Sequence, residues 1–264
     1  GSSALYAGFK SLEIKDNDLI IMPSYTFIAT ATSCILAGGS PWFFDIEKNS
    51  LTLNLDQIQN VLKNKTFKKG KYYFHKKSKQ RIFAICPVYT LGFLPNLKRI
   101  KKIAKKYNLK IIEDVAQAHG ATFKNKPAGS LGDVGCFSFF PGKNIGAIGD
   151  AGAITTNDRN LSKTIKSLRN YGENDFKRSS VRKYTNQFKG YNSRIDEVQA
   201  LILNLKLTNI KRDNVKRKNI ANFYIKNIKN PKLQLPMIAK NTSHVWHLFT
   251  IRTKNRKALI NHLN

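Results

Sequence analysis

The feature of this chain that most constrains its fold is an alternation of apolar runs with amphipathic segments over residues 18–116. The apolar runs are rich in β-branched and aromatic residues, as buried strands are, and they lie at 18–23, 40–46, 81–89 and 109–116. The segments between them carry apolar residues at helical spacing. Strands that alternate with helices form right-handed βαβ crossovers, so the sequence predicts an α/β fold whose mostly parallel sheet is covered on both faces.

The chain is strongly basic, with 46 basic against 16 acidic residues and a formal net charge of +30 among 264 residues. Nucleic-acid-binding proteins often carry such a charge. Here the lysines are scattered through segments that are equally rich in Asn and Ile, such as 100–115 and 203–220. No RNP, zinc-finger or basic-zipper pattern accompanies them, so we expect solvated helix faces and no nucleic-acid partner.

Cysteine usage and hydropathy bear on the compartment. Cys34, Cys86 and Cys136 lie far apart in apolar surroundings, which predicts buried thiols in a reducing compartment. We see no leader-like segment and no apolar run of membrane length. We therefore expect a soluble cytoplasmic protein without a membrane partner, and we expect both ends to be cut relative to a longer protein.

A basic segment with interleaved aromatic residues, "FKKGKYYFHKKSKQ", occupies residues 67–80. It has two interpretations. The segment could be a hairpin that touches phosphates, or a surface excursion whose Tyr and Phe side chains pack locally.

Polar residues follow the fourth apolar run, at the sheet edge where ligands of parallel sheets collect. They are Asp114, Gln117 and His119 in "EDVAQAHGA". A carboxylate at the end of an apolar strand is either a buried, hydrogen-bonded cap of the next loop or an anchor for a cationic ligand. The residue types alone leave both interpretations open.

A single lysine, Lys143, lies in the otherwise apolar and glycine-rich run "FSFFPGKNIGAIGDAGAI". Pro141 and Gly142 break the preceding strand and place Lys143 at the break. An apolar setting lowers the pKa of a lysine and makes its amine a nucleophile that can form a Schiff base. The alternative is a side chain that extends to solvent.

Five motifs in order along the chain resemble those of the DegT/DnrJ/StrS family of sugar-nucleotide aminotransferases. After the N-terminal stretch "GSSALYAGFKSL", they are "FFDI", "EDVAQAHGA", "FSFFPGKNIGAIGDAGAITTND", "LRNYGE" and "YNSRIDEVQALIL". The resemblance implies a fold-type I pyridoxal-phosphate enzyme with a seven-stranded sheet. It also implies a cofactor-binding large domain over residues 1–210 and the start of a small C-terminal α/β domain over 211–264, in which 243–253 reads as a strand.

The resemblance assigns roles around the pyridoxal 5′-phosphate ring. Lys143 matches the lysine that forms the Schiff base and moves the proton, and Asp114 matches the carboxylate that pairs with the pyridinium nitrogen. Gln117 matches the residue near the 3-oxygen of the ring. Phe27 falls where an aromatic side chain stacks on the pyridine, although it could instead belong to the core.

The phosphate group needs other donors. Gly1, Ser2 and Ser138 match the family's phosphate cup, in which amide groups at a helix start favour an anion. Asn192 matches a residue that reaches the phosphate from the other subunit, which implies a homodimer with a shared active site. Ser138 could instead satisfy a backbone group, and Asn192 and Arg194 could cap and brace the helix that follows them.

Some residues depart from the family pattern or stay outside the site. Ser2 replaces the commoner threonine and keeps the hydroxyl. Tyr89 stands where a "His-Leu-Tyr-Gly" or "Asn-Leu-Tyr-Gly" stretch is usual, which puts substrate contacts from that loop in doubt. The 67–80 segment is longer than in most relatives. We interpret His119 as a residue that braces its loop and leave it outside the site.

The implied activity is transfer of an amino group from L-glutamate to a nucleotide-linked keto-6-deoxy sugar, with a dTDP-3-keto sugar favoured over a 4-keto sugar. Such amino sugars enter the O-antigen of lipopolysaccharide, other surface glycans or antibiotics. Two alternatives are a dehydratase of the same fold and a non-catalytic regulator that binds nucleic acid. Dehydratases of this kind carry histidine in place of the lysine, so Lys143 argues against the first, and intact cofactor residues argue against the second.

Overall fold

The computed structural model describes residues 1–173, 185–237 and 243–264. Its strands are β1 (Leu19–Pro23), β2 (Ser40–Phe44), β3 (Thr66–Lys69), β4 (Tyr72–His75), β5 (Arg81–Ile85), β6 (Lys110–Asp114), β7 (Thr122–Phe123), β8 (Lys126–Pro127), β9 (Val134–Ser138) and β10 (Gly152–Thr155). Its helices are α1 (Ser2–Ser11), α2 (Ile28–Leu36), α3 (Leu55–Lys65), α4 (Leu97–Tyr107), α5 (Arg159–Arg169), α6 (Glu197–Leu207), α7 (Ile210–Asn227) and α8 (Arg256–Leu263), with a 3-10 turn at Thr90–Gly92.

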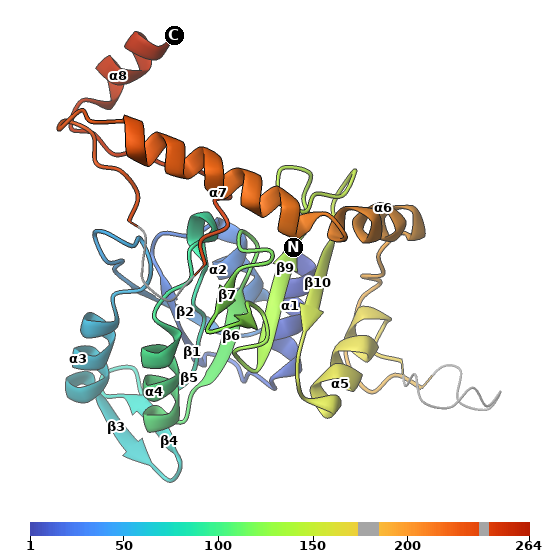
Figure 1. Cartoon of the computed structure of the whole chain (residues 1–264). Coiled ribbons are helices and arrows are strands. Elements are labelled where there is room, and N and C mark those ends of the chain that lie inside the picture. Colours follow the sequence, from blue (N-terminus) through green and yellow to red (C-terminus); the bar gives the residue numbers. More distant parts are fainter. Residues whose placement is uncertain (174–184, 238–242) are drawn as a thin grey trace.

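Eight strands of the described chain form one mixed sheet, in which the path β10-β9-β6-β5-β1-β2 carries β3 and β4 as a side branch on β5 (Figure 1). The pairs β1–β2, β1–β5, β5–β6 and β6–β9 are parallel, as the strand–helix alternation predicted. The prediction of seven strands was wrong by one. The 67–80 segment forms the β3–β4 hairpin, which pairs antiparallel with β5 and enlarges the sheet.

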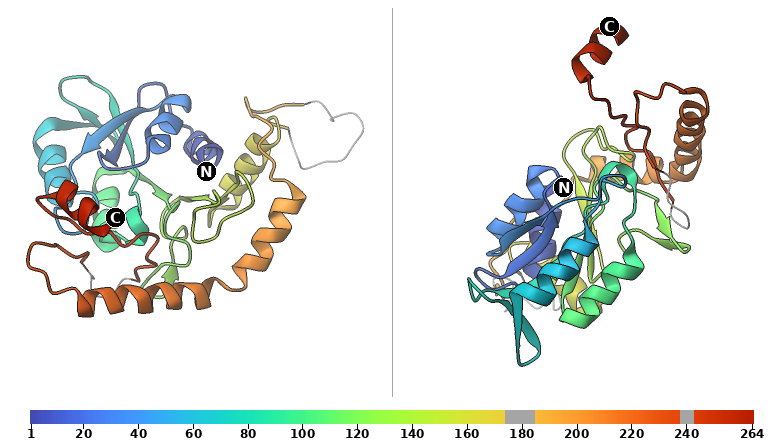
Figure 2. Two further views of the ribbon diagram at one scale, coloured as in Figure 1. Left: turned by 90° about the horizontal axis from the view of Figure 1, so that it is seen from above. Right: turned by 90° about the vertical axis from the view of Figure 1, so that its left-hand side faces the viewer.

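Helices cover both faces of the sheet, with α1 and α2 on one face and α3 and α4 on the other (Figure 2). One buried cluster lies on the α3–α4 side and includes Ile58, Leu62 and Ile100. A second lies on the α1–α2 side and includes Phe9 and Ile20. Burial of these apolar side chains stabilises the sheet from both faces, and it accounts for the nearly uninterrupted apolar character of the central strands.

Helix boundaries follow local capping chemistry. Asn54 and Asn96 accept backbone N–H bonds in the first turns of α3 and α4. Asn108 ends α4 in the left-handed conformation, at φ 52°. Gly38 follows α2 with φ 101°, where a side chain would be strained. These stops lead the chain directly into β6 and β2.

The β3–β4 hairpin packs locally. The Phe67 and Phe74 rings stack at 5.7 Å, and Tyr73 meets Tyr107 of α4 edge-on at 4.8 Å. In Figure 1 the hairpin lies at the lower end of the view, whereas the N-terminus lies near the middle, beside β9. The interpretation of 67–80 as a locally packed excursion therefore agrees with the structure.

Residues 243–253 do not form the predicted strand; the described bridge in this region pairs Arg252 with Gln234. Trp246 has φ 50°, which interrupts an extended backbone. Instead, Val245 donates to the Gly92 carbonyl at 3.0 Å and is itself buried in the first core cluster. The division at residues 210 and 211 stays a prediction.

Two further observations bear on the sequence predictions. Cys34, Cys86 and Cys136 are buried and unpaired, as predicted. Within the described ranges, none of the helices has the length and apolar character needed to cross a membrane.

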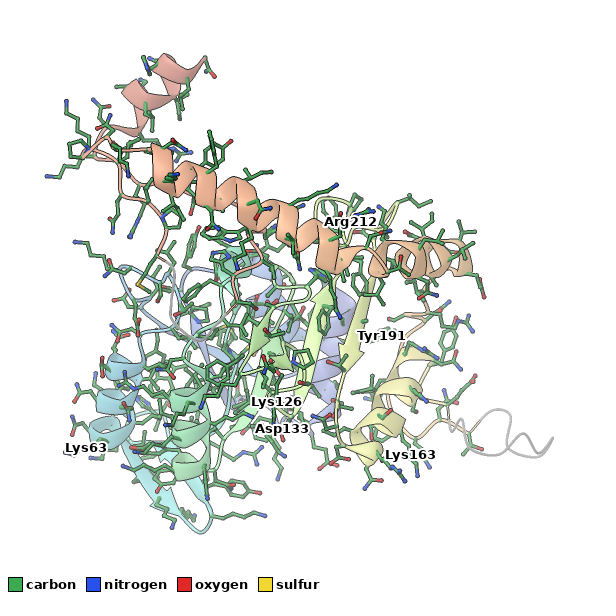
Figure 3. The ribbon with its side chains drawn as sticks, in the orientation of Figure 1. Lys63, Lys126, Asp133, Lys163, Tyr191 and Arg212 are labelled. Carbon is green, nitrogen blue, oxygen red and sulfur yellow. The ribbon has the colours of Figure 1, made fainter. Side chains whose placement is uncertain are left out.

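The basic residues are dispersed over the molecule. Figure 3 labels four of them on four different elements, Lys63 on α3, Lys126 on β8, Lys163 on α5 and Arg212 on α7. This spread agrees with the interpretation of the positive charge as solvated surface rather than one recognition face.

Candidate active site

Asp114 ends β6 at the carboxyl edge of the sheet, and α7 passes over this edge (Figure 1). The residue is buried, with 4% of its surface exposed. The Thr30 hydroxyl of α2 donates to Oδ2 at 2.7 Å, and the Ala116 N–H donates to Oδ1 at 3.1 Å. Asp114 is therefore a buried carboxylate with one bond to each oxygen.

Lys143 lies in a compact turn after β9, residues 139–147, which we call the lysine turn. The Lys143 N–H donates to the Phe140 carbonyl at 2.9 Å, and the Ala147 N–H donates to the Phe139 carbonyl at 2.8 Å. A Cβ at Gly146 would lie 2.1 Å from the Pro141 carbonyl oxygen. The turn can close only because residue 146 has no side chain.

The two groups act on each other electrostatically. Burial raises the pKa of Asp114, while the Thr30 and Ala116 bonds and the charge of Lys143 oppose the rise. Burial lowers the pKa of Lys143, and the Asp114 charge opposes this shift. The structure thus brings Lys143 and Asp114 together at one site, as the sequence predicted, with an amine that is more readily deprotonated than an exposed lysine.

Gly1, Ser2 and Ser138 meet beside this pair. A Cβ at Gly1 would lie only 2.6 Å from the Ser138 Cβ, so the start of α1 is pressed against the end of β9. The first bond of α1 runs from the Leu5 N–H to the Gly1 carbonyl, which leaves the earlier amide groups for another acceptor. Ser138 is 9% exposed, and its Oγ accepts only a long 3.5 Å bond from the Phe140 N–H. These donors suit an anion.

Phe27 is the N-cap of α2 and 74% exposed, which rules out the core alternative. It precedes Thr30 by three residues, so it lies at the helix end that contacts Asp114. Gln117 accepts the Leu91 N–H on Oε1 at 2.6 Å, which leaves its Nε2 as a donor. Phe27 therefore offers an exposed aromatic ring, and Gln117 a free amide donor, near the end of the sheet that carries Asp114.

Asn192 is exposed between α5 and α6, next to Tyr191, which Figure 3 shows at the side of the sheet that carries β10. The Asn192 Oδ1 accepts from Arg194 Nε at 3.1 Å, and Arg194 Nη1 donates to Asn170 at 3.1 Å. These bonds tie the pair to Asn170 at the end of α5, and no described side chain caps the start of α6, so the described contacts do not bear out the interpretation that the pair caps and braces the following helix. The contact of Asn192 with a phosphate in a second subunit stays a prediction.

Sequence reasoning missed several residues that shape the site. Thr30 was not singled out, although a hydroxyl one turn into a helix beside an acidic strand end could have suggested the bond. Glu113 is fully buried and accepts the Tyr89 hydroxyl and the N–H groups of Gly129, Leu131 and Gly132. Because Tyr89 is itself fully buried, it does not reach a substrate.

His119 is 2% exposed, and neither ring nitrogen has a hydrogen-bond partner. The ring lies against Phe137 and Phe139 at 5.8 and 5.5 Å. Burial lowers its pKa to about 4, the nearby Ser138 backbone opposes this shift, and the charges of His247 and Lys143 add smaller contributions. The ring is therefore neutral at pH 7, and its packing agrees with the loop-bracing interpretation.

The 243–247 segment closes one side of the site. Its Val245 and His247 N–H groups donate to the Gly92 and Leu91 carbonyls at 3.0 and 3.1 Å, and the His247 ring reaches Asn144 beside the lysine. A desolvated amine, a buried carboxylate, an exposed aromatic ring and amides at a helix start fit a phosphorylated pyridine cofactor. Among the described residues, no cluster of side chains is suited to a metal ion.

The chain is similar in sequence to curated transaminases that act on nucleotide-linked sugars. Over 98% of this chain, it is 42% identical to a dTDP-3-amino-3,6-dideoxy-alpha-D-galactopyranose transaminase of Aneurinibacillus thermoaerophilus. It is 36% identical, again over 98% of the chain, to a UDP-N-acetyl-3-dehydro-alpha-D-glucosamine 3-aminotransferase of Acidithiobacillus ferrooxidans. The chain spans 65% and 64% of the lengths of these two relatives.

The fold is also that of solved structures. The crystal structure of DesV from S. venezuelae in complex with a ketimine intermediate matches 99% of this chain and 65% of its own, with a TM-score of 0.86 and 34% identity. The fold-type I prediction is thereby confirmed. The cofactor prediction is confirmed for the family and its structural neighbours. One of these neighbours, NtdA from Bacillus subtilis, contains bound pyridoxamine phosphate (PMP). The DegT/DnrJ/EryC1/StrS aminotransferase family model matches residues 1–264, and the chain belongs to this family.

Proposed function

We propose that this chain is the cofactor-binding part of an aminotransferase that moves an amino group from L-glutamate to a keto-6-deoxy sugar linked to a nucleotide. The observation that carries the proposal is the meeting of Lys143 and Asp114 at the carboxyl edge of the sheet, each shifting the pKa of the other. A lysine and a buried carboxylate from different segments are what a pyridoxal-phosphate site requires.

Each site residue has a proposed part in holding the cofactor. Lys143 would bind its aldehyde carbon, Asp114 would pair with its ring nitrogen, and Phe27 would stack on the ring. Gln117 donates from Nε2 to the 3-oxygen. Gly1, Ser2 and Ser138 bind the phosphate, together with Asn192 of a second subunit in a homodimer.

Bound pyridoxal phosphate supplies an electron sink for the carbon that bears the amino group. Asp114 keeps the ring nitrogen protonated, which requires the carboxylate to be ionised. The Thr30 and Ala116 bonds favour that ionised form against the effect of burial. Lys143, whose pKa is lowered by burial, would be a neutral amine able to accept the proton of the substrate carbon.

The names of the relatives support a 3-keto sugar over a 4-keto sugar. Both relatives above are named for an amino group at carbon 3, one on a dTDP sugar and one on a UDP sugar. We favour dTDP because the more similar relative carries that name. We further propose a cytoplasmic enzyme whose product enters O-antigen of lipopolysaccharide, another surface glycan or an antibiotic.

Two alternatives remain outcomes of the test. A dehydratase of this fold would remove a sugar hydroxyl without net amino transfer, and Lys143 argues against it. A regulator that binds nucleic acid would show a salt-sensitive DNA shift and no cofactor absorbance, and the dispersed basic residues argue against it.

The test of the cofactor site is an absorbance spectrum of the protein with pyridoxal phosphate, before and after borohydride. We expect an absorbance band near the edge of the visible range that borohydride removes and that is absent in Lys143→Ala. The same band in Lys143→Ala would refute the proposal. Mass spectrometry of products from dTDP-3-keto and dTDP-4-keto sugars with glutamate then decides the substrate, and loss of a hydroxyl without gain of nitrogen would identify the dehydratase.

A further inference from the structure

One side chain, that of Asn144, ties the lysine turn to two distant segments. Its Nδ2 donates to Oδ1 of Asn214 on α7 at 3.2 Å and to the Val245 carbonyl oxygen at 3.0 Å. Its Oδ1 lies 3.0 Å from Nδ1 of His247. The residue next to Lys143 is therefore bonded at once to α7 and to the 243–247 segment.

Backbone carbonyls fix the orientation of these amides, because a carbonyl oxygen can only accept. The Val245 carbonyl requires Nδ2 of Asn144, so Oδ1 faces His247 and His247 donates from Nδ1. Asn214 donates from Nδ2 to the His119 carbonyl at 2.9 Å, so its Oδ1 faces Asn144. Every bond among Asn144, Asn214, His247 and the two carbonyls thus joins a donor to an acceptor. Through the His119 carbonyl, these bonds also reach the loop that follows β6.

The fit of the 243–247 segment over the site depends on Gly92, which has φ +90°. A Cβ at this position would lie 2.9 Å from Val245 Cγ2 and 3.1 Å from both the His247 nitrogen and the Gln117 carbonyl oxygen. Val245 and His247 therefore lie close against Gly92, and both also contact Asn144 of the lysine turn.

Several titratable groups face Lys143. They are Asp114 at the end of β6, His119 in the loop after it, His247 in the 243–247 segment and the Gly1 nitrogen before α1. Burial lowers the pKa of His247 to about 4, and the charges of Lys143 and Arg217 add to the shift. The imidazole is neutral at pH 7, so it serves as a hydrogen-bond donor without a positive charge beside the amine.

We propose that Asn144 is a positioning residue for Lys143: together with Asn214 and His247 it locks the lysine turn against α7 and the 243–247 segment and keeps the amine in its desolvated place near Asp114. The inference rests on the proposed function for the importance of that amine. It concerns residues that the cofactor does not need to touch.

The test measures the Lys143 amine in the protein without cofactor. Competitive labelling with acetic anhydride across pH, read on the Lys143 peptide by mass spectrometry, reports the titration of this one amine. In Asn144→Ala the turn opens to solvent, and we expect the titration to move up by about one pH unit, a tenfold fall in neutral amine at fixed pH. Asn219→Ala, at an exposed position of the same helix α7, should leave it unchanged.

A second pair of variants separates the hydrogen bond from the ring. His247→Asn places an amide N–H where the ring Nδ1–H lies and should keep the titration near that of the unaltered protein, whereas His247→Ala should shift it upward. This pair decides the question if Asn144→Ala does not fold. Unaltered titration in both alanine variants, or an equal shift in His247→Asn and His247→Ala, would overturn the proposal. Since the readout needs no cofactor, failure of the unaltered protein to bind pyridoxal phosphate would refute the proposed function and leave this result standing.

Discussion

The Thr30 hydroxyl donates to Oδ2 of Asp114 at 2.7 Å and joins a helix to a strand end that lies 84 residues away in the sequence. Thr26 Oγ1 lies 2.8 Å from Thr30 Oγ1. Because the Thr30 proton is directed to the carboxylate, Thr26 is the donor in this second bond. Two hydroxyl groups in series therefore support one buried negative charge, on the residue proposed to face the cofactor nitrogen.

Thr30→Val removes this support with little change of shape. The Thr30 bond is the largest influence that opposes the raised pKa of Asp114, so its loss should raise that pKa further and weaken the ionised form. We expect pyridoxal phosphate to bind roughly five- to tenfold more weakly, which corresponds to a hydrogen bond of about 1 kcal/mol. The measurement is a cofactor titration followed by absorbance.

Thr32→Val is the matched control, because Thr32 is exposed and bonds only carbonyls of its own helix. Equal weakening in both variants would contradict the role of Thr30.

Glu113 supports the loop at 129–132 from inside the protein. Its buried carboxylate accepts three backbone N–H groups and the Tyr89 hydroxyl, so all its neighbours here are donors. Glu113→Gln would direct an amide NH₂ at one of them, and we expect a loss of about 2–4 kcal/mol in the free energy of unfolding.

Tyr89→Phe should cost less, about 1–2 kcal/mol, because it removes one donor and leaves the other three bonds. Urea unfolding of the two single variants and the double variant measures their coupling. Glu13→Gln, at an exposed carboxylate, is the control and should change stability little. Strict additivity of the two buried changes would show that Tyr89 and Glu113 do not act as one unit.

The sequence predicted the parallel sheet and its ligand edge because these depend on local patterns. Apolar runs alternate with segments whose apolar residues have helical spacing, and this alternation predicts parallel strands joined by crossover helices. The carboxyl ends of parallel neighbours such as β6 and β9 then lie at the same edge of the sheet. The pattern therefore placed Asp114 at the ligand edge, and the family resemblance placed Lys143 beside it. The resemblance supplied their proposed roles.

The errors of prediction came from contacts that no local pattern encodes. Residues 243–253 are apolar enough for a strand, yet they bond to residues 91 and 92 and bend at Trp246. The β3–β4 hairpin joined the sheet because β5 leaves one end unpaired by its other neighbours. Asn144 and Asn214 are 70 residues apart, and an asparagine in either position reads as an ordinary polar residue until the fold brings them together.

Acid should destabilise the protein through its buried histidines, of which His119 is the clearest. Its pKa falls from 6.5 in the unfolded chain to about 4 in the folded protein. Between these values the unfolded chain binds more protons, so the free energy of unfolding decreases as the pH falls through this window. The contribution of neutral His119 to the free energy of unfolding is about 3 kcal/mol. It is fully present above pH 6.5 and is lost as the pH falls toward 4.

His119→Phe tests this dependence. Both ring nitrogens lack a hydrogen-bond partner and the ring lies among phenylalanines, so we expect the variant to fold with similar stability at pH 7. Between about pH 6.5 and 4.5, its free energy of unfolding should decrease less than that of the unaltered protein. Urea unfolding at several pH values measures the slope. His262→Gln, at an exposed position near the C-terminus, should keep the slope of the unaltered protein. An unchanged slope in His119→Phe would show that another group controls the acid sensitivity.

Two glycines of the lysine turn offer a matched comparison of backbone space. A Cβ at Gly146 would lie 2.1 Å from the Pro141 carbonyl oxygen, whereas a Cβ at Gly142 would meet only the Phe140 ring at 3.8 Å. Gly146→Ala must therefore displace the backbone that places Lys143, and Gly142→Ala need not. We expect Gly146→Ala to reduce borohydride-trapped pyridoxal phosphate on the Lys143 peptide at least tenfold, roughly, as a shift of the amine of about 1 Å would. Gly142→Ala should trap as much pyridoxal phosphate as the unaltered protein.

The readout is quantitative mass spectrometry of the Lys143 peptide, with circular dichroism to confirm folding of both variants. Full trapping in a folded Gly146→Ala variant would mean that the turn can relax around a methyl group, and that closure at residue 146 does not set the position of the amine.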